Sequence, residues 1–344
     1  MKKRGVGIGC MLYGTGYGNG FPDAASAFVE IHDDGTASVL VGAVDVGQGS
    51  NTIFAQIAAE ELGLTPEEIT VITGDTDVTP DAGTTAATRV TYIGGNAVRK
   101  AAQAAKQPLL EWAAGELGVN TADGLVLKDH RIMVKGFPQK SLPVAEAAFW
   151  ARLRGRRLVG EGTAMTHTTA LDPETGQGAP YWPYAFATQI VEVEVDTETG
   201  KVEVLRVVAA HDVGRAVNPT SVDGQIAGGF SMGLGYALME EVQLAMGRIA
   251  NPSMATYLIP TSLDMPEVMP VIVESEEPSG PYGAKGVGEP ALIPAAPAIL
   301  NAIYDAIGVR IYDLPATPEK ILAALAEKTA GKCGAINAFG VKGV

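Results

Sequence analysis

The chain has 344 residues, of which 25 are Lys or Arg and 39 are Asp or Glu, so its formal net charge is −14 and its pI is near 4.8. An acidic chain repels phosphate backbones, and the composition therefore argues against a nucleic-acid partner. No apolar run reaches the length of about 18 residues that a membrane span needs, so no membrane association is expected. The length predicts two domains or two large subdomains.

The cysteines and histidines do not form a recognisable ligand set. Cys10 and Cys333 lie far apart, and the four histidines show neither HxxxH nor HxH spacing. This pattern excludes a disulfide framework and any Cys-ligated zinc or iron–sulfur site made by this chain alone. The composition is that of a cytoplasmic globular protein. Demanding chemistry would require a cofactor that protein nitrogen and sulfur ligands do not hold.

The first part of the chain shows strand and helix patterns in turn. Residues 26–45 alternate apolar and polar side chains around Asp33-Asp34-Gly35, which predicts a β-hairpin. Helical spacing over 50–63 ends at Gly63, a predicted C-cap. The next predicted elements are a capped turn leading into a strand (65–75), an alanine-rich helix (94–117) and a small hairpin (124–136).

A second unit is predicted after the basic stretch at 152–157. It contains two long alternating strands at 185–214, a Gly-rich helix at 218–241 and a helix at 291–308. Strands and helices mix without a repeating βαβ period, so we predict an α+β fold made of two mixed α/β subdomains. The predicted boundaries are 1–155 for the first subdomain, 156–330 for the second, which carries the Glu289 loop, and 331–344 for a tail.

Several Gly-rich segments each present one polar residue. Segment 14–20 has glycine at every second position but no GK[ST] follows, which favours a loop near a ligand over a nucleotide motif. Gly47-Gln48-Gly49 lies between a strand end and a helix start, where free amides could hold an anion or a polar cofactor edge; an ordinary turn is the alternative. The small residues at 83–98 suit close approach of a bulky anionic cofactor or, alternatively, a simple N-cap.

The last of these segments surrounds an acidic residue. In "GPYGAKGVGEP" (280–290) four glycines precede Glu289, and Pro290 follows it. Gln225, in "DGQIAGGF" (223–230), is a second Gly-flanked glutamine besides Gln48. Glycine concentrates where the backbone needs positive φ or must approach another group closely. Close backbone packing alone does not explain why each of these Gly-rich segments also presents a polar residue.

The ordered set of motifs resembles the xanthine oxidase family. More narrowly, residues from Arg4 to about Leu325 resemble the C-terminal half of the molybdenum-binding region of that family, as in the medium molybdopterin subunit of nicotinate dehydrogenase. The motifs that carry the resemblance are "RGVGIG" (4–9), "GQG" (47–49), "TAAT" (85–88), "DVGRAVNP" (212–219), "GQIAGGF" (224–230), "GAKGVGEP" (283–290) and "LPATPEKI" (314–321).

The resemblance implies a molybdopterin hydroxylase whose metal is held by the dithiolene of an organic pterin. It implies that Glu289 is the catalytic glutamate and that the terminal ligand of the molybdenum is sulfido or selenido. The pterin could carry a cytosine dinucleotide tail. At 88–90 this chain has Thr-Arg-Val where the family often has serines. The implied cofactor-binding residues are Gly47, Gln48, Ala86, Ala87, Thr88, Arg89, Gln225 and Gly288.

The resemblance also implies partners, because family members usually carry an earlier half with its own molybdenum loop. We expect a large molybdopterin subunit, an iron–sulfur subunit with 2Fe-2S clusters and an FAD subunit. The expected reaction is hydroxylation of an N-heteroaromatic substrate, nicotinate-like or purine/xanthine-like, with water-derived oxygen. Aldehyde oxidation, reduction of an aromatic acyl-CoA and a non-catalytic assembly role remain alternatives.

Three residues are candidates for contact with the substrate. Tyr13 and Tyr17 are predicted to lie in the Gly-rich loop before the first hairpin, where their aromatic faces suit a flat heterocycle; ordinary packing is the alternative. Arg310 could neutralise a carboxylate such as that of nicotinate, although a structural arginine is the alternative beside "LPATPEKI". Lys285 is interpreted as supporting the backbone or facing solvent.

Overall fold

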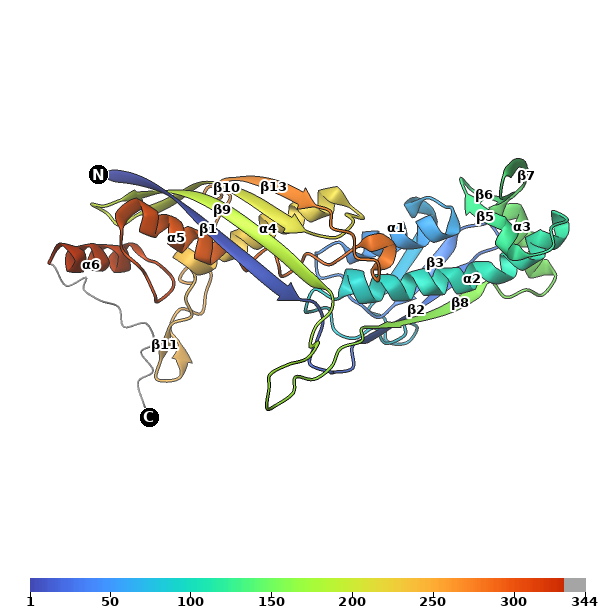
Figure 1. The fold of residues 1–344 in the computed structure, drawn as a ribbon, viewed down its shortest axis with the longest axis horizontal. Helices are drawn as coiled ribbons and strands as arrows, with labels where there is room; N and C mark the ends of the chain where they lie inside the picture. Colours follow the sequence, from blue (N-terminus) through green and yellow to red (C-terminus); the bar gives the residue numbers. More distant parts are fainter. Residues whose placement is uncertain (331–344) are drawn as a thin grey trace.

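The computed structural model describes residues 1–330, which form two α/β units arranged end to end along the longest axis of the molecule (Figure 1). The first unit is built on a four-stranded sheet in the order β4-β3-β2-β8. Helices α1 (Ser50–Leu62) and α2 (Gly95–Glu116) pack on it, and a small sheet lies at its far end with α3 (Val144–Leu153). Its strands are β2 (Ala24–Ile31), β3 (Ala37–Val41), β4 (Ile69–Thr73), β8 (Val159–Met165) and, in the small sheet, β5 (Leu125–Lys128), β6 (Arg131–Val134) and β7 (Phe137–Pro143).

The second unit is built on a sheet in the order β1-β9-β10-β13. Helices α4 (Pro219–Leu238) and α5 (Ala295–Ile307) cover one face of this sheet, and α6 (Pro318–Thr329) follows them. No helix within residues 1–330 combines the length and the apolar character that crossing a membrane would require. The strands are β1 (Lys2–Gly14), β9 (Tyr184–Asp196), β10 (Val202–Asp212), β13 (Glu267–Val273) and, in a protruding hairpin, β11 (Leu244–Ala245) and β12 (Arg248–Ile249).

The predicted local elements and the α+β class are confirmed. β2 and β3 form the predicted hairpin, and α1 is capped by Gly63, whose φ of 65° is the left-handed conformation of a C-cap. One helix begins later than predicted, because α5 starts at Ala295 instead of residue 291. The intervening residues form a turn in which the Leu292 amide donates to the Glu289 carbonyl at 3.0 Å.

The two sheets do not divide at residue 155. β1 pairs with β9 and thus belongs to the second unit, although it opens the chain, and β8 pairs with β2 and thus belongs to the first. Both pairings join residues more than 120 positions apart, which local patterning does not reveal. The structural units therefore differ from the predicted boundaries. The predicted tail at 331–344 lies outside the described residues.

The glycines of "RGVGIG" let β1 lie directly against α5. Every second residue from Gly5 to Gly9 faces this helix, and a Cβ on Gly7 would overlap the carbonyl oxygen of Ala298. The same arrangement recurs in the first unit, where a Cβ on Gly160 of β8 would overlap the Ala101 carbonyl of α2. In each unit, strand glycines and helix alanines bring two backbones together.

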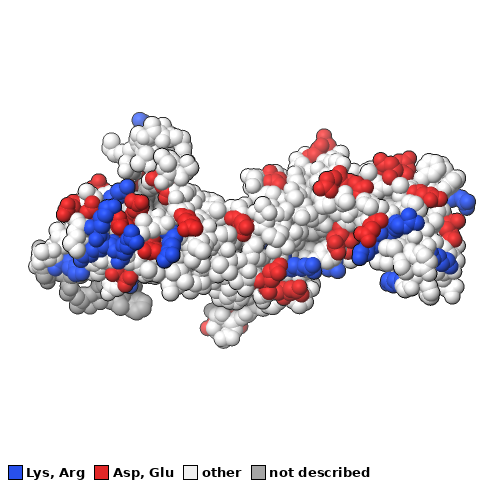
Figure 2. Space-filling model, turned by 90° about the horizontal axis from the view of Figure 1, so that it is seen from above, with Lys and Arg blue, Asp and Glu red and all other residues white. Residues whose placement is uncertain are grey.

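The opposite face of the second sheet has no covering element among the described residues. One row across its four strands consists of Ile8, Ile190, Val208 and Met269. Seen from above (Figure 2), blue and red side chains alternate at the end formed by the second unit, and the waist between the units is mostly white. The apolar side chains on this face, 40% to 64% exposed, are Val6, Ile8, Leu12, Phe186, Ile190, Met269, Val271 and Val273.

Candidate functional site

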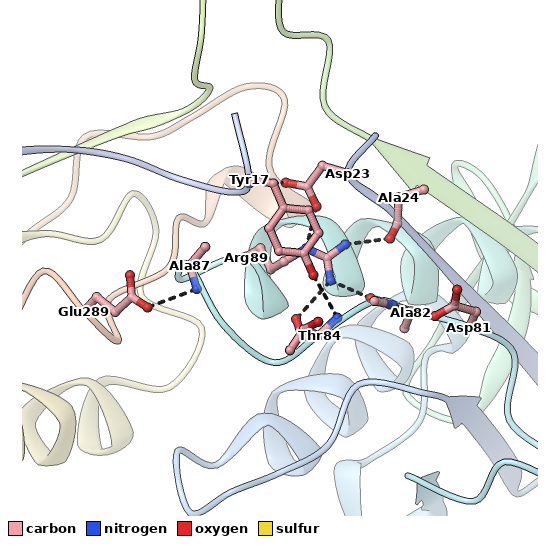
Figure 3. A network of polar contacts seen from close by, with 10 residues as sticks. Tyr17, Asp23, Ala24, Asp81, Ala82, Thr84, Ala87, Arg89 and Glu289 are labelled. Atoms are coloured by element: carbon pink, nitrogen blue, oxygen red, sulfur yellow. Dashed lines mark hydrogen bonds and ion pairs between the residues drawn. The ribbon is translucent and has the colours of Figure 1, made fainter. Parts of the chain in front are cut away.

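Glu289 lies at the junction of the two units, and both of its carboxylate oxygens accept hydrogen bonds. The Tyr13 hydroxyl, at the end of β1, donates to Oε2. The backbone amide of Ala87, from the first unit, donates to Oε1 at 3.0 Å (Figure 3). The amide of Glu289 itself donates to Thr88 Oγ1 at 3.1 Å. The carboxylate is thus oriented by donors from both units while it stays exposed at the surface of this chain.

The loop that receives Glu289 has an unusual backbone. Ala87 and Thr88 have φ values of 52° and 58°, in the left-handed region that residues with a Cβ rarely adopt. The Gly16 amide donates to the Ala87 carbonyl at 2.9 Å and holds this turn from one side. Gly286 closes it from the other side, because a Cβ there would overlap Thr88. The strain is therefore kept in place by neighbours at the site.

Arg89 anchors the same loop to β2. Its guanidinium, 1% exposed, pairs with Asp23 Oδ1 through Nε at 2.5 Å. It also donates to the carbonyls of Ala82 and Ala24 at 2.5 and 2.6 Å (Figure 3). All of these partners lie inside the first unit. The guanidinium supports the loop, so a cofactor contact from Arg89 would have to come from other atoms of this residue.

The two tyrosines occupy different positions. Tyr13 is not in a loop as predicted, because β1 continues to Gly14, which pairs with Tyr184 of β9. Tyr17 does lie in the loop, where its hydroxyl accepts the Thr84 amide at 2.9 Å and its ring lies 5.1 Å from the guanidinium carbon of Arg89. Tyr13 therefore contacts Glu289 directly, whereas Tyr17 packs against the loop that holds it.

The backbone amides of the "GQG" turn are not free, contrary to the expectation from sequence. The Asp45 carboxylate accepts hydrogen bonds from Gly47 at 2.8 Å, from Gly49 at 3.3 Å and from Asn51 at 3.1 Å. Burial raises the pKa of Asp45, but these backbone hydrogen bonds together outweigh that effect and hold the pKa below its usual value. The anion at the start of α1 is thus a side chain of the protein itself.

Gln48 also has internal partners. Its Oε1 accepts the Val46 amide at 2.7 Å, and its Nε2 donates to Ser50 Oγ at 2.9 Å and to the Val44 carbonyl at 3.2 Å. These contacts fix the amide plane at the edge of a hollow. A ligand can therefore meet a glutamine amide in one fixed orientation.

A hollow of about 240 Å³ lies beside Glu289, between the two units. It is lined by small residues and amide groups, and a Cβ on Gly288 would meet nothing closer than 3.9 Å, so this glycine borders open space. A second hollow shares Gln48 and Gln225 with it and reaches Arg215, in the segment before α4. Amide donors, a cation and little steric bulk fit a planar anionic cofactor. The predicted residues that line the first hollow are Gln48, Ala86, Thr88, Arg89, Gln225, Gly288 and Glu289.

Two basic residues lie elsewhere. Arg310 donates to Asn301 Oδ1 at 2.6 Å and covers the Tyr304 ring at 3.8 Å, so it packs on α5 and the structure does not bring it to Glu289. Lys285 donates to Asp212 Oδ2 at 2.7 Å and to the Tyr184 carbonyl at 3.1 Å. Its ammonium is largely buried. Lys285 therefore supports the backbone and does not face solvent, which is the first of the two interpretations given from the sequence.

Sequence reasoning missed the polar residues that support the site from behind. Asp45 has a readable signal, because an acidic residue shortly before a helix start is a common anchor for the first amides of that helix. Gln189 and His211 break the apolar pattern at inward-facing positions of β9 and β10, where both are fully buried. A polar residue at an inward strand position was the signal available.

The fold and this site define a cofactor-binding region of the molybdenum hydroxylases. Residues 1–266 match the family described as molybdopterin cofactor-binding domain, and the chain belongs to this family. It is similar to the xanthine dehydrogenase molybdenum-binding subunit of Escherichia coli O157:H7, with 36% identity over 329 residues that cover 93% of this chain and 42% of that subunit.

Two further relatives agree with this assignment. The subunit gamma of the 6-hydroxypseudooxynicotine dehydrogenase complex of Paenarthrobacter nicotinovorans is 34% identical over 330 residues, which cover 94% of this chain and 40% of that subunit. The crystal structure of quinoline 2-oxidoreductase from Pseudomonas putida 86 has a TM-score of 0.84 and 30% identity, covering 95% of this chain and 42% of that chain. The chain thus spans less than half the length of these proteins.

Proposed function

We propose that this chain supplies the catalytic glutamate and one wall of the molybdopterin site in a hydroxylase that acts on an N-heteroaromatic ring, nicotinate-like or purine/xanthine-like. The observation that carries the proposal is the Glu289 carboxylate, oriented by Tyr13 and Ala87 at the edge of the hollow between the units. Two relatives support the substrate class, because their names refer to xanthine and to quinoline, which are both nitrogen heterocycles.

Each residue has a defined role in this proposal. Bound molybdopterin would supply the oxidation of the substrate carbon and would take up its electrons. Gln48, Gln225, Gly288 and the backbone from Ala86 to Thr88 would hold the pterin edge, with Gly47 shaping the turn. Glu289 would accept the proton of the water-derived hydroxyl group as its oxygen attacks the ring. Tyr13, at the end of β1, and Tyr17, in the loop that follows, would form one wall of the substrate pocket.

The remaining part of the site is proposed to come from a large molybdopterin subunit, so that this chain acts as the medium subunit. Two observations support a partner. The Glu289 carboxylate is exposed, whereas catalysis requires it to be shielded from bulk water, and no element within residues 1–330 covers the apolar face of the second sheet. Iron–sulfur and FAD subunits would complete the electron path. Cys10, an exposed free thiol, suits a reducing cytoplasmic location.

The test is Glu289→Gln in the complex purified with its natural subunits. Loss of a general base lowers turnover by about 10²- to 10⁴-fold, and we expect a kcat decrease in this range with unchanged molybdenum content and subunit composition. Glu116→Gln, at the exposed end of α2, is the matched control and should leave kcat unchanged. Near-normal turnover of Glu289→Gln would rule out the general base. A panel of heterocycles, aldehydes and aromatic acyl-CoA thioesters separates the substrate classes.

A further inference from the structure

The loop that carries Glu289 is fixed to the second sheet at two points, one on each side of this residue. The first point is Lys285, whose amide donates to the Val213 carbonyl at 2.9 Å and whose ammonium pairs with Asp212 at 2.7 Å. The second point lies at Ala291. Gln189 Nε2, from β9, donates to the Ala291 carbonyl at 2.8 Å. The anchors thus lie four residues before and two residues after Glu289.

The second point is a pair of side chains and not one residue. Gln189 Nε2 also lies 3.2 Å from His211 Nε2 on the neighbouring strand β10. Because the Ala291 carbonyl requires a donor, the Gln189 amide must present Nε2 to it, and this orientation makes Nε2 the donor to His211 as well. His211 therefore accepts through Nε2 and carries its proton on Nδ1. Burial lowers the pKa of His211 to about 4, which keeps the ring neutral at neutral pH.

Gln189 and His211 occupy buried strand positions at which two apolar side chains would ordinarily pack better. Gln189 and His211 are both fully buried, and within residues 1–330 neither Gln189 Oε1 nor His211 Nδ1 has a hydrogen-bond partner. Buried polar atoms without a partner destabilise a fold. Neither residue lines the hollow beside Glu289, so cofactor binding does not account for them. Together these two side chains direct one hydrogen bond out of the pair, from Gln189 Nε2 to the Ala291 carbonyl.

We propose that Gln189 and His211 are positioning residues that hold the Glu289 backbone through Ala291; the inference rests on the proposed catalytic role of Glu289. The hydrogen bond from the Leu292 amide to the Glu289 carbonyl transmits the constraint directly to Glu289. His211 acts as the acceptor that fixes the second hydrogen of the Gln189 amide, which leaves the first hydrogen directed at Ala291.

Amide hydrogen exchange of the isolated chain tests the anchor without any cofactor. In Gln189→Leu, exchange of the Leu292 amide should become at least about tenfold faster. The reason is that the neighbouring Ala291 carbonyl is no longer held by a hydrogen bond, so the turn closed by the Leu292 amide opens more often. Thr188→Val, one residue along β9 on the opposite face, is the control and should leave this exchange unchanged. Unchanged exchange in Gln189→Leu would overturn the anchor.

Two variants of His211 separate positioning from simple loss of packing. His211→Gln keeps an acceptor for Gln189 and should retain near-normal Leu292 exchange, whereas His211→Phe removes the acceptor and should accelerate it severalfold. In the assembled enzyme, Gln189→Leu and His211→Phe should lower kcat about tenfold at unchanged KM and molybdenum content. Faster exchange with unchanged kcat would overturn the positioning role. Normal turnover of Glu289→Gln would instead overturn the proposed function and leave the exchange result standing.

Discussion

Gly7→Ala tests the contact between β1 and α5, because two opposing effects act on the same substitution. Gly7 has no positive φ, so its extended backbone permits alanine. Through the unfolded state alone the substitution would stabilise the protein by about 0.4–1 kcal/mol. In the folded state, however, the new Cβ would lie 2.8 Å from the Asn301 carbonyl carbon and closer still to Ala298 O and Ala302 N. The sign of the result therefore shows which effect dominates.

The size of the steric effect follows from ordinary contact distances. Carbon–oxygen contacts between backbones lie at about 3.3 Å or more, so α5 would have to move away from β1 by about 1 Å. Overpacking of this kind in a buried contact costs about 1–3 kcal/mol, and a gap of that width also weakens dispersion along the helix. We expect a net loss of about 2 kcal/mol in the free energy of unfolding.

The assay is urea unfolding followed by far-UV circular dichroism, with Gly115→Ala as the matched control. Gly115 lies inside α2 and a Cβ there would meet nothing within 4 Å, so this substitution should stabilise the chain by about 0.5–1 kcal/mol. The two glycine-to-alanine changes should thus shift the midpoint in opposite directions. A neutral or stabilising Gly7→Ala would refute the interlocked packing of β1 on α5.

Two further predictions concern buried ionisable side chains. Asp23→Asn leaves the buried Arg89 guanidinium without its carboxylate and should lower the free energy of unfolding by about 3 kcal/mol in urea titrations, whereas the exposed Asp81→Asn should change it by less than about 1 kcal/mol. His211 has a pKa of about 4 when folded and 6.5 when unfolded, so its neutral form stabilises the fold above pH 6.5 and this contribution is lost as the pH falls toward 4. Between pH 7.5 and 5.5 the wild type should lose about 1 kcal/mol more than His211→Gln; equal losses would contradict the buried neutral histidine.

Local structure could be read from the sequence because it depends on local signals. The hairpin around Gly35, the C-cap at Gly63 and the extent of α2 follow from alternation, glycine placement and helical spacing. The partner of β1 could not be read in this way, because β1 and β9 are separated by the whole first unit. Alternating glycines in a strand mark close packing, but they do not say against which helix.

For the candidate site too, the sequence revealed local motifs but not the contacts between them. The motifs identified Glu289, Gln48 and Gln225, which the structure places around a common hollow. They could not show that the "GQG" amides are already taken by Asp45, since that depends on a three-dimensional turn. Arg310 was a candidate because of its charge. Charge does not reveal that this side chain folds back onto Asn301 and Tyr304 of α5.

The exchange of strands between the units has a consequence for how the chain can be divided. β1 precedes the first unit but completes the second sheet, and its first residue, Lys2, pairs with Asp196, 194 positions away. Contacts of such high sequence separation slow folding, because a long loop must be closed before they form. No single cut of the chain therefore yields two fragments that both keep complete sheets.

The ends of the described fold suggest a different order. Lys2 pairs with Asp196, and the nearby Gly200 lies against Pro318 at the start of α6, so β1 begins close to the last helix. A circularly permuted chain that begins at residue 15 and carries β1 behind α6 would encode each unit in one continuous stretch. In this topological sense the two sheets are separable, and the position of β1 in the sequence interlocks them.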